Sequence, residues 1–135
     1  MISGFPGHPV EDIKRDGIRI IYKGGGTDAQ AALKPAEKEN AYPEPGMFES
    51  TPSYGFYIRH VKGIEFNNVQ VSFTDEEARP AFFLQDVTNA GFLHIKAKRS
   101  EGVPEFVLKN VENFSTHYAI SVPDTVVIKT ENIRF

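Results

Sequence analysis

Paired acidic residues are the first candidates for chemistry in this sequence. Glycoside hydrolysis normally needs two carboxyl groups about 5 to 9.5 Å apart, one acting as an acid and the other as a base or nucleophile. The adjacent carboxylates are Glu11 with Asp12 and the run Asp75, Glu76 and Glu77. Neighbouring residues of a strand point to opposite faces, which separates the first pair, and we expect the second run to be a solvated turn. The sequence therefore predicts no catalytic carboxylate pair.

Motifs for other chemistries are incomplete. The histidines lack the i, i+2 or i, i+4 spacing of local metal ligands; they are His8, His60, His94 and His117. The chain has no Cys for a thiolate site and no Gly-x-Ser-x-Gly motif for acyl transfer. Gly24-Gly25-Gly26 lacks the Gly-Lys-Ser/Thr ending of a phosphate loop. We predict no catalytic residue, no metal site and no cofactor.

A group of aromatic and basic residues is the best candidate for binding. These residues lie near an expected long loop or face it, and they are Tyr42, Tyr54, Tyr57, Arg59, His60, Lys62 and Arg79. Aromatic rings stack on sugar faces, and Arg or Lys pairs with uronate carboxylates, so the group predicts an acidic-glycan site. A structural alternative stays open, in which Tyr57 and Arg59 are outward residues of a strand that the loop covers.

Composition narrows the class of protein. A chain of 135 residues with 40% hydrophobic residues can bury about two-thirds of its unfolded surface, which predicts one globular domain over residues 1–135. The net charge of −3 and the lack of long Lys/Arg runs argue against a nucleic-acid partner. No apolar run of about 18 residues and no signal-peptide pattern occur, so we expect no membrane partner, and the localisation stays open.

The elements that position these residues follow from an internal repeat. Three segments that begin at Phe56, Phe82 and Phe106 share the alternation of a short strand before a polar turn, with spacings of 26 and 24 residues. The three segments also align beyond their first residues, and we call each set of aligned residues a column. The further columns are Ile64, Ala90 and Phe114; Phe66, Phe92 and Thr116; Val69, Ile95 and Ala119; and Val71, Ala97 and Ser121. Each repeat thus carries three short alternating stretches, and a helical periodicity is missing.

A unit of about 25 residues with three strands and Asn-containing bends is typical of one coil of a parallel β-helix. We expect an all-β fold, a right-handed solenoid of about four to five coils, since parallel crossovers are right-handed. A loop over about 23–53 interrupts it, with a short helix from Thr27 or Asp28 that ends before Pro35. A leucine-rich repeat is the alternative with the same period.

Partial coils and polar corners complete the prediction. Residues 10–20 form a first coil, and residues 126–129 repeat residues 106–109 at a distance of 20, which predicts a last coil over 126–135. Asn tolerates left-handed backbone and can form hydrogen-bonded ladders, so we place coil corners at the asparagines. They are Asn67, Asn68, Asn89, Asn110, Asn113 and Asn132.

The order of ISGFPGHPVEDIKRDGIRI, YKGGGT, PEPGMF and YGFYIRHVKGIEFNNVQVSF resembles the C-terminal coils of family 28 glycoside hydrolases, the polygalacturonase-like enzymes. The resemblance covers essentially the whole chain and implies a right-handed parallel β-helix from a family that is typically secreted or periplasmic. The family's Asn-x-Asp, Asp-Asp, Gly-His-Gly and Arg-x-Lys motifs are absent, and Gly7-His8-Pro9 falls too early for the catalytic histidine. The resemblance therefore implies coils without the catalytic segment.

We expect a non-catalytic β-helix module with a structural or weak carbohydrate-binding role. One alternative is an active glycoside hydrolase on pectic, uronate-containing glycans, which would require a carboxylate such as Glu65 or Asp86. The other is a self-assembling structural protein, because open coil edges expose unpaired backbone groups that a homo-oligomer would cover.

Overall fold

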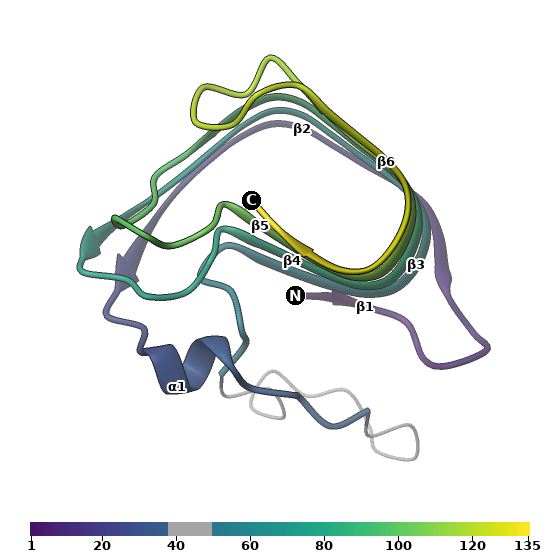
Figure 1. Cartoon of the computed structure of the whole chain (residues 1–135), viewed down its shortest axis with the longest axis horizontal. Coiled ribbons are helices and arrows are strands. Elements are labelled where there is room, and N and C mark those ends of the chain that lie inside the picture. Colours follow the sequence, from purple (N-terminus) through teal and green to yellow (C-terminus); the bar gives the residue numbers. More distant parts are fainter. Residues whose placement is uncertain (38–49) are drawn as a thin grey trace.

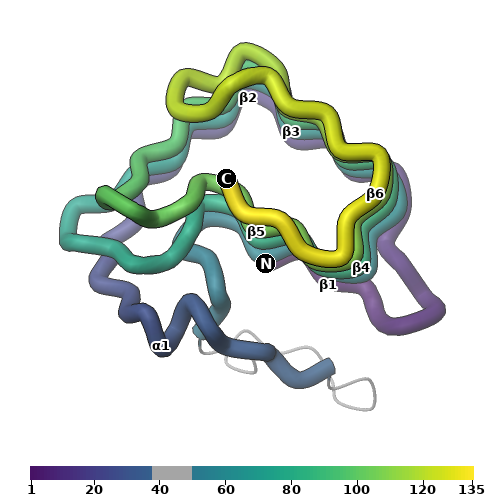
Figure 2. Tube along the Cα trace, viewed as in Figure 1, coloured from purple at the N-terminus to yellow at the C-terminus, as the bar shows by residue number. Residues whose placement is uncertain are grey.

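The computed structural model describes residues 1–37 and 50–135, and this part of the chain is all-β. One sheet contains the six strands β1 (Ile2–Ser3), β2 (Val10–Gly24), β3 (Phe56–Asp75), β4 (Phe82–Ala97), β5 (Phe106–His117) and β6 (Thr125–Arg134). A short helix, α1 (Asp28–Ala31), lies between β2 and β3 in the sequence. Figure 1 shows that the long strands bend around a common interior, and Figure 2 shows their traces stacked on one another.

The strand register confirms the repeat columns within the three strands, whereas Ala119 and Ser121, the expected third members of two columns, follow the end of β5 and are not paired. Phe56 pairs with Phe82, which pairs with Phe106, and all three strands run parallel. β1 and β2 both pair with β3, so together they make the first layer. β3, β4 and β5 make the second, third and fourth layers. The spacings of 26 and 24 residues are therefore the lengths of successive circuits of the chain.

Each layer turns at three corners where the backbone is left-handed. In β3, β4 and β5 the first corner is His60, Asp86 and Asn110, the second is Gly63, Asn89 and Asn113, and the third is Asn68, His94 and Tyr118. All nine have φ between 49° and 85°, a region that favours Gly, Asn and Asp. Four of the predicted asparagine corners are confirmed. Asn67 and Asn132 are not corners, because both lie in paired strand positions.

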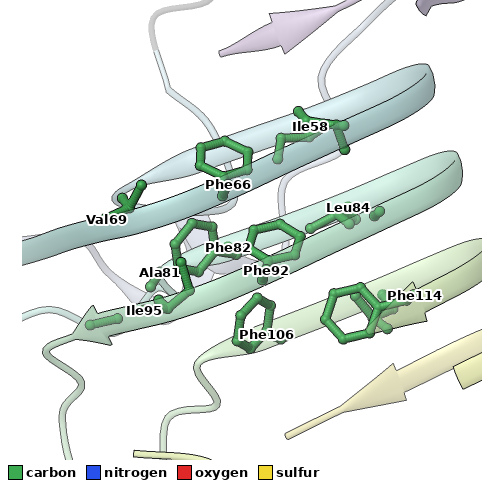
Figure 3. Packing of buried hydrophobic residues seen from close by; sticks show 14 of the residues in the cluster. Ile58, Phe66, Val69, Ala81, Phe82, Leu84, Phe92, Ile95, Phe106 and Phe114 are labelled. Carbon is green, nitrogen blue, oxygen red and sulfur yellow. The ribbon is translucent and has the colours of Figure 1, made fainter. Parts of the chain in front are cut away.

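The interior holds two adjacent columns of phenylalanine rings (Figure 3). Phe66 and Phe92 stack with centroids 5.0 Å apart, and Phe82 and Phe106 stack at 4.9 Å. All four are 1% exposed or less. Because parallel layers repeat at about 4.8 Å, each of the two columns adds one ring per layer in contact with the next. Burial of these rings is the main force that holds the layers in register.

The predicted last coil is wrong, because β6 does not continue the parallel stack. It pairs antiparallel with β5, with Val127 opposite Phe114 and Ile133 opposite Leu108. The backbone of Phe135 exchanges two hydrogen bonds with Phe106, of 2.8 and 3.0 Å. Residues 118–124 alone join the two strands. A connection of that length closes a hairpin, whereas a parallel return needs a full circuit.

The predicted short helix is confirmed. Thr27 is the N-cap of α1, and its side chain accepts a hydrogen bond from the backbone N–H of Gln30. The Gln30 side chain accepts one from the N–H of Thr27 in return, which completes a capping box.

Candidate functional site

A cleft at the first corner gathers the polar residues of three layers. It has a volume of about 350 Å³ and is lined by Phe5, Gly7, Pro9, His60, Val61, Lys62, Asp86, Thr88, Asn110 and Glu112. We call it the His60 cleft. One wall comes from the loop between β1 and β2, which projects from the stack in Figure 1. The other wall is the outer face of β3, β4 and β5.

The loop of residues 4–9 has a defined conformation against the layers. The backbone N–H of Gly4 donates to the carbonyl of Arg59 at 3.1 Å, and Phe5 and His8 exchange hydrogen bonds of 3.1 and 2.8 Å. A side chain at Gly4 would meet the carbonyl of His60 at 2.6 Å, so only glycine allows this approach. The loop thereby holds Phe5 at the cleft.

The outer wall repeats polar groups at the layer spacing. Lys62, Thr88 and Glu112 stand in register on β3, β4 and β5. The corner residues next to them also align, and the Asn110 amide donates to Asp86 at 2.6 Å. The cleft therefore presents donors and acceptors in a row about 4.8 Å apart.

His60 lies between two carboxylates. Its Nε2 is 2.9 Å from both oxygens of Glu37, and its Nδ1 is 3.6 Å from Oδ2 of Asp86. An ionised carboxylate only accepts hydrogen bonds, so Nε2 is the donor to Glu37. His60 is 9% exposed and belongs to the predicted binding group.

Arg59 fixes the segment that carries Glu37. The Arg59 side chain is 1% exposed and donates to Oγ of Ser3 at 3.0 Å and to the carbonyls of Pro35 and Ala36 at 2.7 and 2.8 Å. Its Nη1 also lies 3.6 Å from Glu37, and its guanidinium is 5.6 Å from the centre of the Tyr57 ring. Residues 35–37 are thus clamped to β3.

Of the other predicted binding residues, Lys62 lines the cleft, whereas the described tyrosines are buried and Arg79 lies elsewhere. Tyr57 donates to the Gln85 side chain at 3.1 Å, and Tyr54 donates to the carbonyl of Lys98 at 2.6 Å. Burial raises the pKa of both tyrosines. These contacts match the structural alternative, in which a covering segment packs on Tyr57 and Arg59. Tyr42 lies outside the described residues.

Arg79 belongs to a separate cluster with Glu77. Glu77 is 2% exposed and accepts hydrogen bonds from the Arg79 side chain at 2.7 and 2.9 Å and from the N–H of Gly26 at 3.1 Å. Burial acts to raise the pKa of Glu77, but these hydrogen bonds outweigh it and leave the pKa lowered. The expectation of a solvated turn is therefore wrong for Glu77. Its side chain anchors the loop at Gly24-Gly25-Gly26, which we call the glycine loop.

A second cleft of about 390 Å³ lies at the second corner, lined by Asp12, Ile13, Lys14, Gly63, Ile64, Glu65, Asn89 and Gly91. Gly63 and Gly91 supply no side chains, which leaves the outer face hollow there. Lys14 lies 3.7 Å from Glu65 in an exposed ion pair. Sequence reasoning missed Phe5, Asp12 and Glu112, because only the strand register brings residues of successive layers together.

Among the residues that the structure describes, no three His, Asp or Glu side chains are grouped as metal ligands. In the same part of the chain, no helix is long and apolar enough to cross a membrane. Comparison with models of protein families, with curated proteins and with solved structures finds no match for this chain.

Proposed function

We propose that this protein is a right-handed parallel β-helix module that binds an acidic glycan in the His60 cleft without cleaving it. The observation that carries the proposal is the row of polar side chains from three layers opposite Phe5. The resemblance to polygalacturonase-like enzymes and the parallel register of four layers support the solenoid. The handedness follows from the rule for parallel crossovers.

The chemistry of the cleft suits a sugar chain. Lys62 offers an ammonium group for a uronate carboxylate, and Thr88 and Asn110 offer neutral donors and acceptors for hydroxyl groups. Phe5 adds an aromatic surface to the same wall. An extended ligand that follows the stack would meet a polar side chain at each layer.

The carboxylates of the cleft have partners that argue against a catalytic role. Asp86 accepts from Asn110 at 2.6 Å, and Glu112 lies 3.0 Å from the ammonium of Lys129. Each of these carboxylates already binds a protein group, which a catalytic acid or base would have to give up to contact a substrate. The proposal is therefore a binding role.

The test is calorimetric titration with trigalacturonate. We expect the Lys62→Ala and Phe5→Ala variants each to bind about tenfold more weakly, which corresponds to the loss of one charge-assisted contact or one stacked ring. Lys96→Ala is the matched control, because Lys96 is exposed in β4 and does not line the cleft. No binding by the wild type would overturn the proposal, and release of reducing ends would overturn its non-catalytic part.

Self-assembly is a second candidate function, which the apolar residues on the outermost strands favour. Ile21 in β2 is 60% exposed, and Val126 and Ile128 in β6 are 63% and 72% exposed. Light scattering after size-exclusion chromatography tests it over a range of concentrations. We expect a dimer that Ile128→Lys converts to a monomer, and a wild-type monomer of about 15 kDa would exclude this candidate.

A further inference from the structure

We propose that Glu37 is a built-in competitor of the ligand, whose carboxylate occupies the place at His60 that a carboxylate of the glycan would take. The inference rests on the proposed function and adds a means of regulation to the same site. Binding of an acidic ligand would then require Glu37 to leave His60.

The groups that hold Glu37 form a receptor for a carboxylate. The His60 Nε2 contacts both carboxylate oxygens at 2.9 Å, and Nη1 of Arg59 lies 3.6 Å from one of them. One cationic side chain and one imidazole donor thus converge on a single carboxylate. This is the arrangement by which proteins recognise an anionic group of a ligand.

Contacts other than those with Glu37 hold Arg59 and His60, the two residues of this receptor, in place. Arg59 is held by Ser3 and by the carbonyls of Pro35 and Ala36. The left-handed corner fixes the backbone of His60, with φ of 51°. Both side chains are 10% exposed or less. The two groups would therefore keep their positions when Glu37 moves away, so the receptor is preorganised.

Glu37 is held less firmly than the two residues that bind it, His60 and Arg59. The side chain of Glu37 is 34% exposed, and its partners among the described residues are His60 and Arg59. An ion pair with a partly exposed carboxylate contributes little to stability, because water competes for it. Rotation of this one side chain frees His60, while the carbonyls of residues 35 and 36 stay bound to Arg59.

The histidine that binds Glu37 also lines the His60 cleft. His60 lines it together with Lys62 and Asp86, and Asp86 faces the other ring nitrogen at 3.6 Å. In the part of the chain that the structure describes, the charged groups around His60 are therefore Glu37, Asp86, Arg59 and Lys62. A ligand carboxylate can replace Glu37 with no change in the net charge of the site, whereas a neutral ligand has no reason to displace it.

The experiment compares the wild type with Glu37→Gln by calorimetry, using trigalacturonate and its methyl ester. If Glu37 occupies His60 in nine molecules out of ten, its removal raises the apparent affinity for trigalacturonate about tenfold. We expect the affinity for the uncharged ester to change less than twofold. Glu76→Gln is the matched control, because it removes an exposed carboxylate that does not line the cleft. His60→Gln added to Glu37→Gln should abolish the gain.

An unchanged affinity for trigalacturonate in Glu37→Gln, or an equal gain for both ligands, would overturn the inference. If neither protein binds trigalacturonate, the proposed function fails, and an acetate titration decides the inference separately. The proton resonances of the His60 ring should then respond to acetate at lower concentration in Glu37→Gln than in the wild type. An identical response in the two proteins would refute the competition.

Discussion

The side-chain amide of Asn110 donates to the carboxylate of Asp86, one layer away at the same corner, over 2.6 Å. Both residues have left-handed backbone, with φ of 49° and 54°. The next corner repeats the relationship, since Asn113 donates to Asn89 at 3.0 Å. These four corner residues therefore have two tasks, because they turn the chain and their side chains join neighbouring layers.

Replacement of Asn113 should separate these two tasks. In Asn113→Ala the ladder is lost and an alanine must adopt φ of 54°, so we expect a loss of about 2 kcal/mol in the free energy of unfolding. Asn113→Gly loses only the ladder and should cost about half as much. Urea denaturation measures both. Asn132→Ala in β6 is the control and should change little, and a similar loss there would refute a role special to the corner.

Arg59 should be essential for the stability of the fold. Arg59→Met keeps much of the buried volume but leaves the carbonyls of Pro35 and Ala36 without their donor. We expect a loss of about 3 kcal/mol in the free energy of unfolding. Arg59→Lys should recover only part of it, because an ammonium cannot reproduce the planar fork. Arg19→Met, at an exposed position of β2, serves as the control in the same denaturation series.

The glycine loop should not tolerate a methyl group at Gly26. A Cβ atom there would overlap the Glu77 carboxylate and the Arg79 guanidinium, so Gly26→Ala must displace the ion pair that they form. We expect a loss of about 3 kcal/mol in thermal or urea unfolding. A Cβ atom at Gly91 meets nothing within 4 Å, and Gly91→Ala should leave the stability unchanged. Equal stability of the two variants would show that Glu77 and Arg79 can rearrange.

Glu105 makes the stability depend on pH. It is fully buried, and among the described residues no group lies within good hydrogen-bond geometry of either carboxylate oxygen. Burial raises the pKa of Glu105 to about 7, and the nearby Arg99 and Ser121 offset this only in part. The folded protein therefore holds a proton that the unfolded chain releases at lower pH. The contribution of this group to stability is complete below pH 4.5 and is lost as the pH rises to about 7.

Glu105→Gln should remove this pH dependence. Between pH 5 and pH 8 the wild type should lose on the order of 2 kcal/mol more stability than the variant. The difference between the two proteins isolates Glu105 from every other titrating group. Denaturation at several pH values is the measurement. Parallel pH profiles for the two proteins would mean that Glu105 finds a partner when it ionises.

The columns of the repeat were predictable because side-chain alternation and left-handed corners are local properties of the sequence. Phe56, Phe82 and Phe106 fall in register as the 26- and 24-residue spacings require. The direction of β6 was not predictable from the same pattern, since a period of two residues is identical in both directions of a strand. The connection of residues 118–124 between β5 and β6 indicates an antiparallel hairpin better than the side-chain pattern does, because it is too short for a full circuit.

The candidate site was predictable only in part. His60 lies at the cleft as the binding hypothesis requires, but its neighbours Phe5 and Glu112 come from other layers. Glu77 was expected in solvent because its own stretch of sequence is acidic, and its burial depends on Gly26, 51 residues away. Contacts between residues so far apart in the sequence depend on the path of the chain from one layer to the next. No local sequence pattern encodes that path.

Because β6 runs antiparallel to β5, the two ends of the stack of strands should differ in how readily they unfold locally. Every earlier layer is joined to the next by a complete circuit, so its release requires the chain to unwind around the interior. β6 is held to β5 as a hairpin and can peel away without unwinding the other layers. Fraying should therefore begin at β6, and amide exchange should spread from there toward β3.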